Sequence, residues 1–192
     1  MAPVHGTTIA VVGPEAQHVL SSLDRFAGVD AMALADADSE TAAKLIATSD
    51  ATYVVHDVDP LRHVAAAWVE FFDDQSTAEV LDLEVEAAVS RLVSGEAFMP
   101  DYYVVIEPAS LEGTWRHWWL GALAHLAPMR VLPMEASASS VRGLLRSLPT
   151  SRPWPAPDAW LPSLKFAVPD AWLPSLKFAV PDHVGLNLRL SA

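Results

Sequence analysis

The densest group of side chains able to do chemistry is His56, Asp57 and Asp59, which ends a β-branched and aromatic run. Such a run predicts a buried strand over 52–56. Imidazole and carboxylate groups at a strand end can bind a divalent cation, and His56 can act as a general base. The alternative interpretation is a solvated loop that turns at the proline after Asp59. A metal would need a further ligand, for which His63 is the candidate.

A second stretch with possible chemistry is the turn Gly13-Pro14-Glu15. It joins a predicted buried strand over 9–12 to a helix that begins at about residue 15. Turn amides and a helix N-terminus together favour an anion, so α/β proteins bind phosphate at such turns. This turn carries a single glycine, no lysine and a glutamate. The element has the shape of a phosphate site without the side chains that would complete one.

Strand and helix patterns alternate along residues 1–149. Alternation of this kind predicts an α/β fold with a mainly parallel sheet of about five strands and helices on both faces. We treat residues 1–149 as the α/β domain. The predicted strands cover residues 9–12, 28–35, 52–56, 102–106 and 130–134.

The predicted helices begin at capping residues. Ser39 and Thr114 each precede a helical pattern and can cap its first turn, and either Ser137 or Ser139 can cap the last helix. A longer helix is predicted over 78–93, and its apolar face is expected along Val80, Leu83, Ala87 and Leu92.

Ligands of parallel sheets bind at the carboxyl ends of the strands. The strand ends predicted here present Asp36, Asp38, Glu107 and Glu135 besides the two stretches described first. A nucleotide- or metal-dependent enzyme, or a small-ligand binder, would therefore use acids near Gly13, Asp36 and Asp57.

In order and hydrophobic pattern, residues 7–149 resemble a small GTPase-type P-loop domain. The segment TIAVVGPEAQHVLSSL is similar to the strand, loop and first helix of that family, and SDATYVVHDVDP to the strand that carries its magnesium-side aspartate. DYYVVIEPAS is similar to the strand before the base-recognition motif, and RVLPMEASASSVRGLLRSLP to the last strand, loop and helix. The resemblance places a nucleotide against Gly13, Pro14, Glu15, Asp57 and Ser137.

The family's phosphate and Mg²⁺ ligands are replaced in this chain. His18, Val19 and Leu20 stand where a second glycine, a lysine and a hydroxyl residue are needed. The resemblance therefore implies a nucleotide-independent relative that needs no cofactor. A competing resemblance is the Rossmann dinucleotide unit, in which Asp36 would bind ribose hydroxyls; its Gly-x-Gly-x-x-Gly fingerprint is absent.

Charge and composition narrow the functional classes. Residues 1–150 contain 8 basic and 21 acidic side chains, and an acidic body of this kind repels nucleic-acid phosphate. The absence of cysteine excludes disulfides and fits a reducing cytoplasmic setting. No apolar run reaches the ~20 residues that span a bilayer, so we expect a cytoplasmic protein that is not transmembrane.

Tryptophans supply the candidate interaction surface. Trp115, Trp118 and Trp119 cluster on one predicted helix, while Trp160 and Trp172 lie in the tail. Aromatic anchors dominate interfaces, so these five residues are candidates for binding another protein or a second copy of the chain. In the alternative interpretation, the helix tryptophans cover the sheet and the tail packs on them.

The tail, residues 150–192, contains a tandem duplication. PDAWLPSLKFAV occurs at 157–168 and again, without a single change, at 169–180. Its alternating apolar residues predict short extended segments. If one copy suffices for folding, the other should loop out or replace it in register. We expect a non-catalytic adaptor or regulatory protein that acts through protein–protein interaction.

Overall fold

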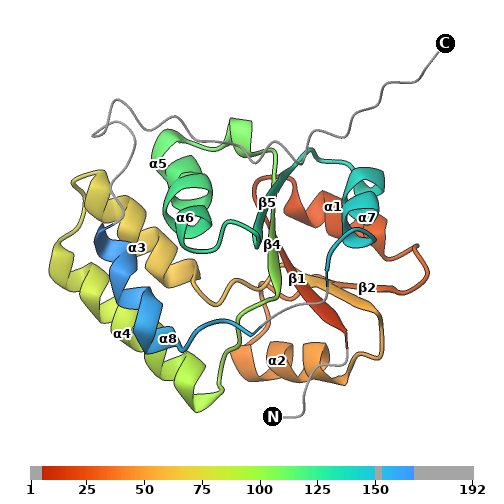
Figure 1. Ribbon diagram of the computed structural model, residues 1–192, viewed down its shortest axis with the longest axis horizontal. Coiled ribbons are helices and arrows are strands. Elements are labelled where there is room, and N and C mark those ends of the chain that lie inside the picture. Colours follow the sequence, from red (N-terminus) through yellow and green to blue (C-terminus); the bar gives the residue numbers. More distant parts are fainter. Residues whose placement is uncertain (1–5, 150–152, 167–192) are drawn as a thin grey trace.

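The computed structural model describes residues 6–149 and 153–166 (Figure 1). Its centre is a five-stranded, all-parallel sheet with the strand order β2-β3-β1-β4-β5. This confirms the predicted α/β class and the parallel sheet. The strands are β1 (Thr7–Val12), β2 (Val29–Met32), β3 (Tyr53–His56), β4 (Tyr102–Ile106) and β5 (Val131–Met134).

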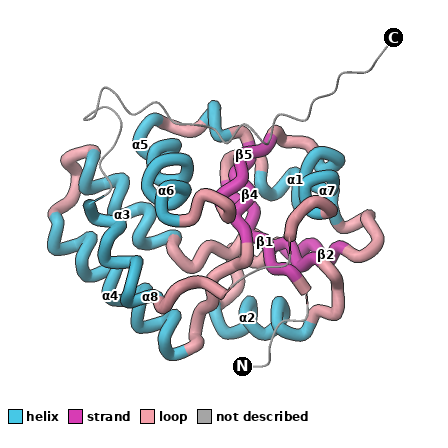
Figure 2. The backbone as a smooth tube through the Cα atoms, viewed as in Figure 1, coloured by secondary structure: helices cyan, strands magenta, loops and turns pink. Residues whose placement is uncertain are grey.

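Helices cover both faces of the sheet (Figure 2). One face packs against α1 (Ala16–Leu23) and α7 (Ala138–Leu145). The other face is covered by α2 (Ser39–Thr48), α3 (Arg62–Phe72) and a helical stretch formed by α5 (Gly113–His117), η2 (Trp118–Leu123) and α6 (Ala124–Leu126), and α4 (Ala78–Ser94) packs on α3. The short elements η1 (Pro108–Ser110), α8 (Pro157–Trp160) and η3 (Leu161–Phe166) complete the described chain.

The pleat of β1 divides the core into two layers. Ile9 and Val11 point to the face covered by α1 and α7, whereas Ala10 and Val12 point to the face covered by α3 and η2. All four side chains are at most 9% exposed. A strand that is buried on both faces has a continuous run of apolar residues. This is why β1 and β4 are easily recognised as strands in the sequence.

The strand order differs from that of the Rossmann unit. In that unit β2 lies beside β1, whereas here β3 lies between them, with Ile9 opposite Val55 and Ala31 opposite Val55 on the other side. The competing Rossmann resemblance is therefore wrong in topology as well as in its missing glycines. The helix that follows β1 packs on one face of the sheet, and the helix that follows β3 packs on the other. The direction of the connections therefore changes between these two neighbouring strands.

Of three predicted helix caps, two are corrected and one is confirmed. The cap of α2 is Asp38 rather than Ser39: its Oδ1 accepts a hydrogen bond from the Thr41 amide at 2.9 Å. Thr114 does not cap α5; its hydroxyl donates to Asp73 at 2.6 Å. The Ser137 cap of α7 is confirmed, since its Oγ accepts from the Ser140 amide at 3.3 Å.

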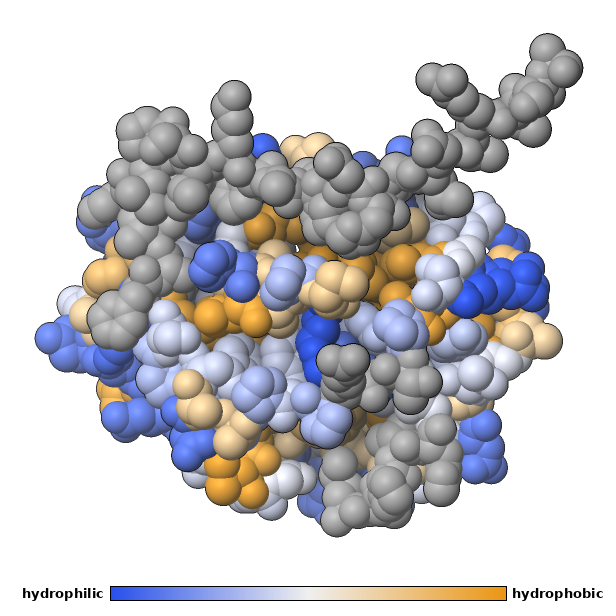
Figure 3. All heavy atoms as spheres, in the orientation of Figure 1, coloured by the Kyte–Doolittle hydropathy of each residue, from blue (hydrophilic) through white to orange (hydrophobic). Residues whose placement is uncertain are grey.

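The face of α4 that meets the core is also not the predicted one. Leu81, Val85 and Ala88 are buried there, while Val80 and Leu83 are 41% and 65% exposed. Figure 3 shows hydrophobic side chains at the surface over the lower end of α4. Apolar residues line both sides of this helix, so their spacing alone could not select the inner one.

The described part of the tail is helical and not extended. Residues 157–166 form α8 and η3, which pack against α4. Their buried residues belong to the main core cluster, the apolar layer that also contains buried residues of α3, α4 and η2. The expected extended segments are wrong for these residues, because the proline at the start of α8 suits a helix N-terminus. The second copy of the repeat lies outside the described residues. Within the described ranges, no helix is long and apolar enough to cross a membrane.

Candidate functional site

The carboxyl edge of the sheet gathers most of the predicted site residues. The ends of β1, β3 and β4 lie side by side, since Ala10 pairs with His56 and Val12 pairs with Val105. Ligands of open parallel sheets bind in the crevice where the direction of the connections changes. Here that crevice lies between the loop that begins at Gly13 and the loop that begins at Asp57.

Gly13 makes a close backbone approach at this edge. Its φ is +110°, and a Cβ built there would lie 2.4 Å from the carbonyl oxygen of Ile106. A side chain is excluded on both grounds. The turn contains only Gly13, Pro14 and Glu15 before α1 begins, and Val19 and Leu20 of that helix are buried in the core. The glycine therefore serves the packing of β1 against β4.

Asp57 is bound by the chain itself. One carboxylate oxygen accepts hydrogen bonds from the amides of Leu34 and Ala35, at 2.6 and 2.8 Å. These contacts tie the loop after β2 to the end of β3. Asp36 is exposed, and Asp38 caps α2 with its pKa lowered by the hydrogen bond from Thr41.

Asp59 is the most perturbed acid of the edge. Its Oδ1 accepts hydrogen bonds from the Leu61 amide at 2.9 Å and from the Tyr103 hydroxyl at 3.0 Å. Burial raises the pKa of its enclosed carboxyl group to about 6, and these hydrogen bonds together with Arg62 oppose the rise. Burial also raises the pKa of Tyr103 well above its ordinary value, so this hydroxyl remains a donor.

His56 is a buried and neutral side chain. It is 1% exposed, and neither ring nitrogen is within hydrogen-bond geometry of a partner among the described residues. Burial lowers its pKa to about 4. Its nearest aromatic neighbour is Phe98, whose ring lies edge-on at 6.2 Å between centroids.

The structure does not join His56, Asp57 and Asp59 into a metal site. Within residues 6–149 and 153–166, no group of three or more His, Asp or Glu side chains is placed to hold a metal ion. His56 lies within the sheet, Asp57 is turned to the loop after β2, and Asp59 is turned to Tyr103. Each side chain thus has a separate structural environment.

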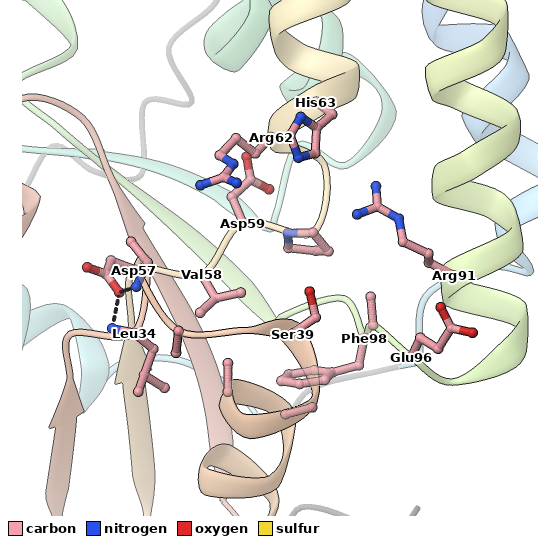
Figure 4. A pocket seen from close by; sticks show the side chains of 16 residues that line it. Leu34, Ser39, Asp57, Val58, Asp59, Arg62, His63, Arg91, Glu96 and Phe98 are labelled. Carbon is pink, nitrogen blue, oxygen red and sulfur yellow. Dashed lines mark hydrogen bonds between the residues drawn. The ribbon is translucent and has the colours of Figure 1, made fainter.

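A pocket with both polar and apolar lining residues opens beside these loops, with a volume of ≈ 130 Å³. Figure 4 shows Asp57, Asp59 and Arg62 along one side of it and Arg91 across from them. His63 also lines this pocket, whereas none of residues 13–15 does. This pocket therefore includes Asp57 but not the turn that the P-loop resemblance pairs with it.

Sequence reasoning missed the far wall of this pocket. Arg91, Glu96 and Phe98 come from the end of α4 and the loop after it, and they reach the pocket only through the packing of α3 on α4. No motif marks these residues, so the sequence offers no signal for them.

The other edge residues are structural as well. Glu107 adopts φ +48°, and its carboxylate accepts a hydrogen bond from the Ala136 amide at 2.7 Å. This contact holds the loop after β5 against the end of β4. Ser137, placed near a nucleotide by the resemblance, caps α7.

The candidate interaction tryptophans form an aromatic cluster inside the protein. Trp118 and Trp119 are 0% and 4% exposed, and Trp160 is 7% exposed. Trp115 is half-buried against the same cluster, and Trp172 lies outside the described residues. In this structure the helix tryptophans belong to the core layer on one face of the sheet, and the described part of the tail packs on α3 and α4 within the same cluster.

Comparison with known proteins does not assign the chain to a family. No protein-family model, no curated protein and no solved structure matches it. The fold class consequently depends on the five-stranded parallel sheet itself, and the P-loop relationship remains a resemblance in the order of elements.

Proposed function

We propose that this protein is a non-catalytic adaptor or regulatory protein that acts through protein–protein interaction on a P-loop-like α/β domain. The proposal rests on the hydrogen bonds that the polar side chains at the carboxyl edge of the sheet already make. The polar groups that a nucleotide would need there, Asp57, Glu107 and Ser137, already bind the chain's own backbone amides.

The turn after β1 supports the same conclusion. A phosphate-binding loop of the P-loop type runs through eight residues and ends in a lysine and a hydroxyl residue. The connection from β1 to α1 has three residues, and Glu15 adds a negative charge beside the helix N-terminus. Two like charges at ~4 Å repel by about 4 kcal/mol at an effective dielectric of ~20, so a triphosphate is disfavoured there.

The outer face of α4 is the proposed contact surface. Val80 and Leu83 are three residues apart and are 41% and 65% exposed, and Val93 near the end of the helix is 67% exposed. Glu79, Glu84 and Glu86 lie beside Val80 and Leu83, whereas the helix has a single base, Arg91. Apolar anchors framed by negative charge fit an amphipathic helix of another protein that carries lysine or arginine beside its apolar face.

The first experiment is a thermal-shift panel with GTP, ATP, NAD(P) and divalent cations. The proposal expects no change in Tm with any of them. A ligand at one hundred times its Kd would raise the Tm of a chain of this size by about 5 °C or more. A shift of that order with any nucleotide would refute the non-catalytic assignment.

The second experiment tests the α4 face with a defined probe, a synthetic amphipathic helix of leucine, alanine and lysine. Leu83→Glu should weaken its binding at least tenfold in fluorescence anisotropy. The matched control is Leu45→Glu, at an exposed apolar residue of α2 that is 43% exposed. Equal loss in both variants, or a concentration-dependent mass of the free protein that Leu83→Glu abolishes, would overturn the assignment to a basic partner.

A second candidate function is small-ligand binding in the pocket beside Asp57. The observation in its favour is the meeting of Asp59, Arg62, His63 and Arg91 around one opening. Its volume of ≈ 130 Å³ is well below the ~300–1,000 Å³ usual for ligand sites, which ranks it second. A thermal shift caused by one of the nucleotides or divalent cations of the same panel, and lost in Arg62→Ala, would favour this function.

A further inference from the structure

The described part of the first copy of the repeat packs on a surface formed by α3 and α4. Trp160, Leu161 and Leu164 are at most 7% exposed and belong to the main core cluster with residues of α3 and α4. Trp68 of α3 donates from Nε1 to the carbonyl oxygen of Leu164 at 3.0 Å. Figure 2 shows α8 beside α4, in agreement with their contacts. We call this surface of α3 and α4 the tail groove.

A charge pair fixes the polar end of the docked copy. Lys165 Nζ lies 2.9 Å from Asp82 Oδ1 on α4. The groove thus recognises a tryptophan, two leucines and a lysine at fixed spacing. Each of these residues recurs twelve positions later, as Trp172, Leu173, Leu176 and Lys177.

We propose that the tail groove binds either copy of the repeat, so that residues 169–180 of the same chain replace residues 157–168 in an exchange of register. The two segments are identical, and the contacts that Trp160, Leu161, Leu164 and Lys165 make with α3 and α4 are available to their counterparts. One groove and two occupants leave one copy outside the groove at any time.

The residues before each copy make the two registers unequal. Trp154 stacks on Trp160 with ring centroids 5.2 Å apart and donates from Nε1 to the Pro100 carbonyl at 2.7 Å. The guanidinium of Arg130 lies 4.6 Å from the Trp154 ring. Six residues before Trp172, where Trp154 stands before Trp160, the sequence has Phe166. A phenylalanine can stack but has no N–H for Pro100, so the first register is favoured.

The connection from α7 adds to this preference. In the second register, the linker after α7 grows by the twelve residues of the displaced copy. Loop-closure entropy then favours the first register by about threefold. Both effects predict that the second copy is the minor occupant in the natural chain and becomes the major one when the first copy loses its anchor.

The stability experiment compares Trp160→Ala in the full chain with Trp160→Ala in a chain that has one copy. Deleting residues 157–168 or 169–180 gives the same protein, so the one-copy chain is a matched control. Loss of a buried tryptophan should lower the Tm of the one-copy chain by about 10 °C. We expect less than half of that fall in the full chain and a fall within ~1 °C for Trp172→Ala. Equal falls for Trp160→Ala in both chains would overturn the exchange.

A crosslinking experiment reads the register directly and uses full-length chains. The natural sequence has no cysteine, so Asp82→Cys can be paired with Lys165→Cys or with Lys177→Cys and treated with a short bismaleimide. Asp82→Cys/Lys177→Cys should give a minor intramolecular product, and Trp160→Ala should raise it at least threefold. Absence of that product in the Trp160→Ala chain would overturn the proposal. A crosslinked dimer in its place would do so too, because the second copy would then sit on another molecule.

Discussion

His56 and Asp59 make opposite contributions to stability between pH 4 and pH 6. Burial raises the pKa of Asp59 from 3.8 to about 6, so the native state holds a proton that the unfolded chain releases. This contribution is present at low pH and is lost as the pH rises through 6. Burial lowers the pKa of His56 from 6.5 to about 4, so between these two values His56 is protonated in the unfolded chain and neutral in the native state. This second contribution is present above pH 6.5 and is lost as the pH falls through 4.

The two contributions nearly cancel in that window. One proton changes the free energy of unfolding by about 1.4 kcal/mol per pH unit, so each group alone would account for ~2–3 kcal/mol between pH 4 and pH 6. Asp59→Asn removes the titration and keeps an acceptor oxygen for the Leu61 amide and the Tyr103 hydroxyl. Relative to the natural chain, this variant should become more stable by ~1–3 kcal/mol as the pH rises from 4 to 6. His56→Leu should shift by a similar amount in the opposite direction.

The measurement is urea unfolding followed by tryptophan fluorescence at intervals from pH 4 to pH 7.5. Differences between variants isolate the two groups, because the other carboxylates titrate in every chain. The double variant should run parallel to the natural chain over pH 4–6. If the curves of Asp59→Asn and the natural chain are parallel throughout, the carboxyl group is not held in a desolvated native environment and the reasoning fails.

Two further predictions concern the central strands. Gly13→Ala should lower the free energy of unfolding by at least ~2 kcal/mol, because it combines backbone strain with a clash against Ile106. The control is Gly95→Ala, where φ is +77° but no atom lies within 4 Å of a Cβ placed on the glycine. This variant should lose about half as much free energy of unfolding in the same urea titration. Asp101→Ala should cost ~1–3 kcal/mol, because its carboxylate accepts from both the amide and the hydroxyl of Thr8, at 2.8 and 3.1 Å; amide exchange at Thr8 should rise with it, and unchanged protection there would contradict this role.

The sheet could be predicted because its signals are local. β4 is an unbroken run of buried residues, and Pro133 in β5 indicated an edge or a strand end, which the strand order confirms. The order of the strands could not be predicted in the same way. It depends on which faces the helices cover, and that is decided by packing between segments as distant as β1 and β4.

The candidate site was predicted in position but not in organisation. Asp57 and Asp59 do stand at the carboxyl end of β3, yet apart from the Leu61 amide their hydrogen-bond partners lie 22 to 44 residues away. A spacing pattern can show that two carboxylates are near each other in the chain. It cannot show that one turns to the loop after β2 and the other to the Tyr103 hydroxyl.

The wrong face predicted for α4 has the same physical origin and links the two proposals. Val80 and Leu83 follow helical spacing as well as Leu81 and Val85 do, so periodicity gives this helix two apolar sides. The tail settles which side is covered, because α8 and η3 pack on α4 together with α3 and place Lys165 on Asp82. The outward stripe of Val80 and Leu83 is left exposed by the same packing. The occupant of the tail groove and the contact surface of α4 therefore share one helix, and a change of register in the tail acts on the helix that carries the proposed interface.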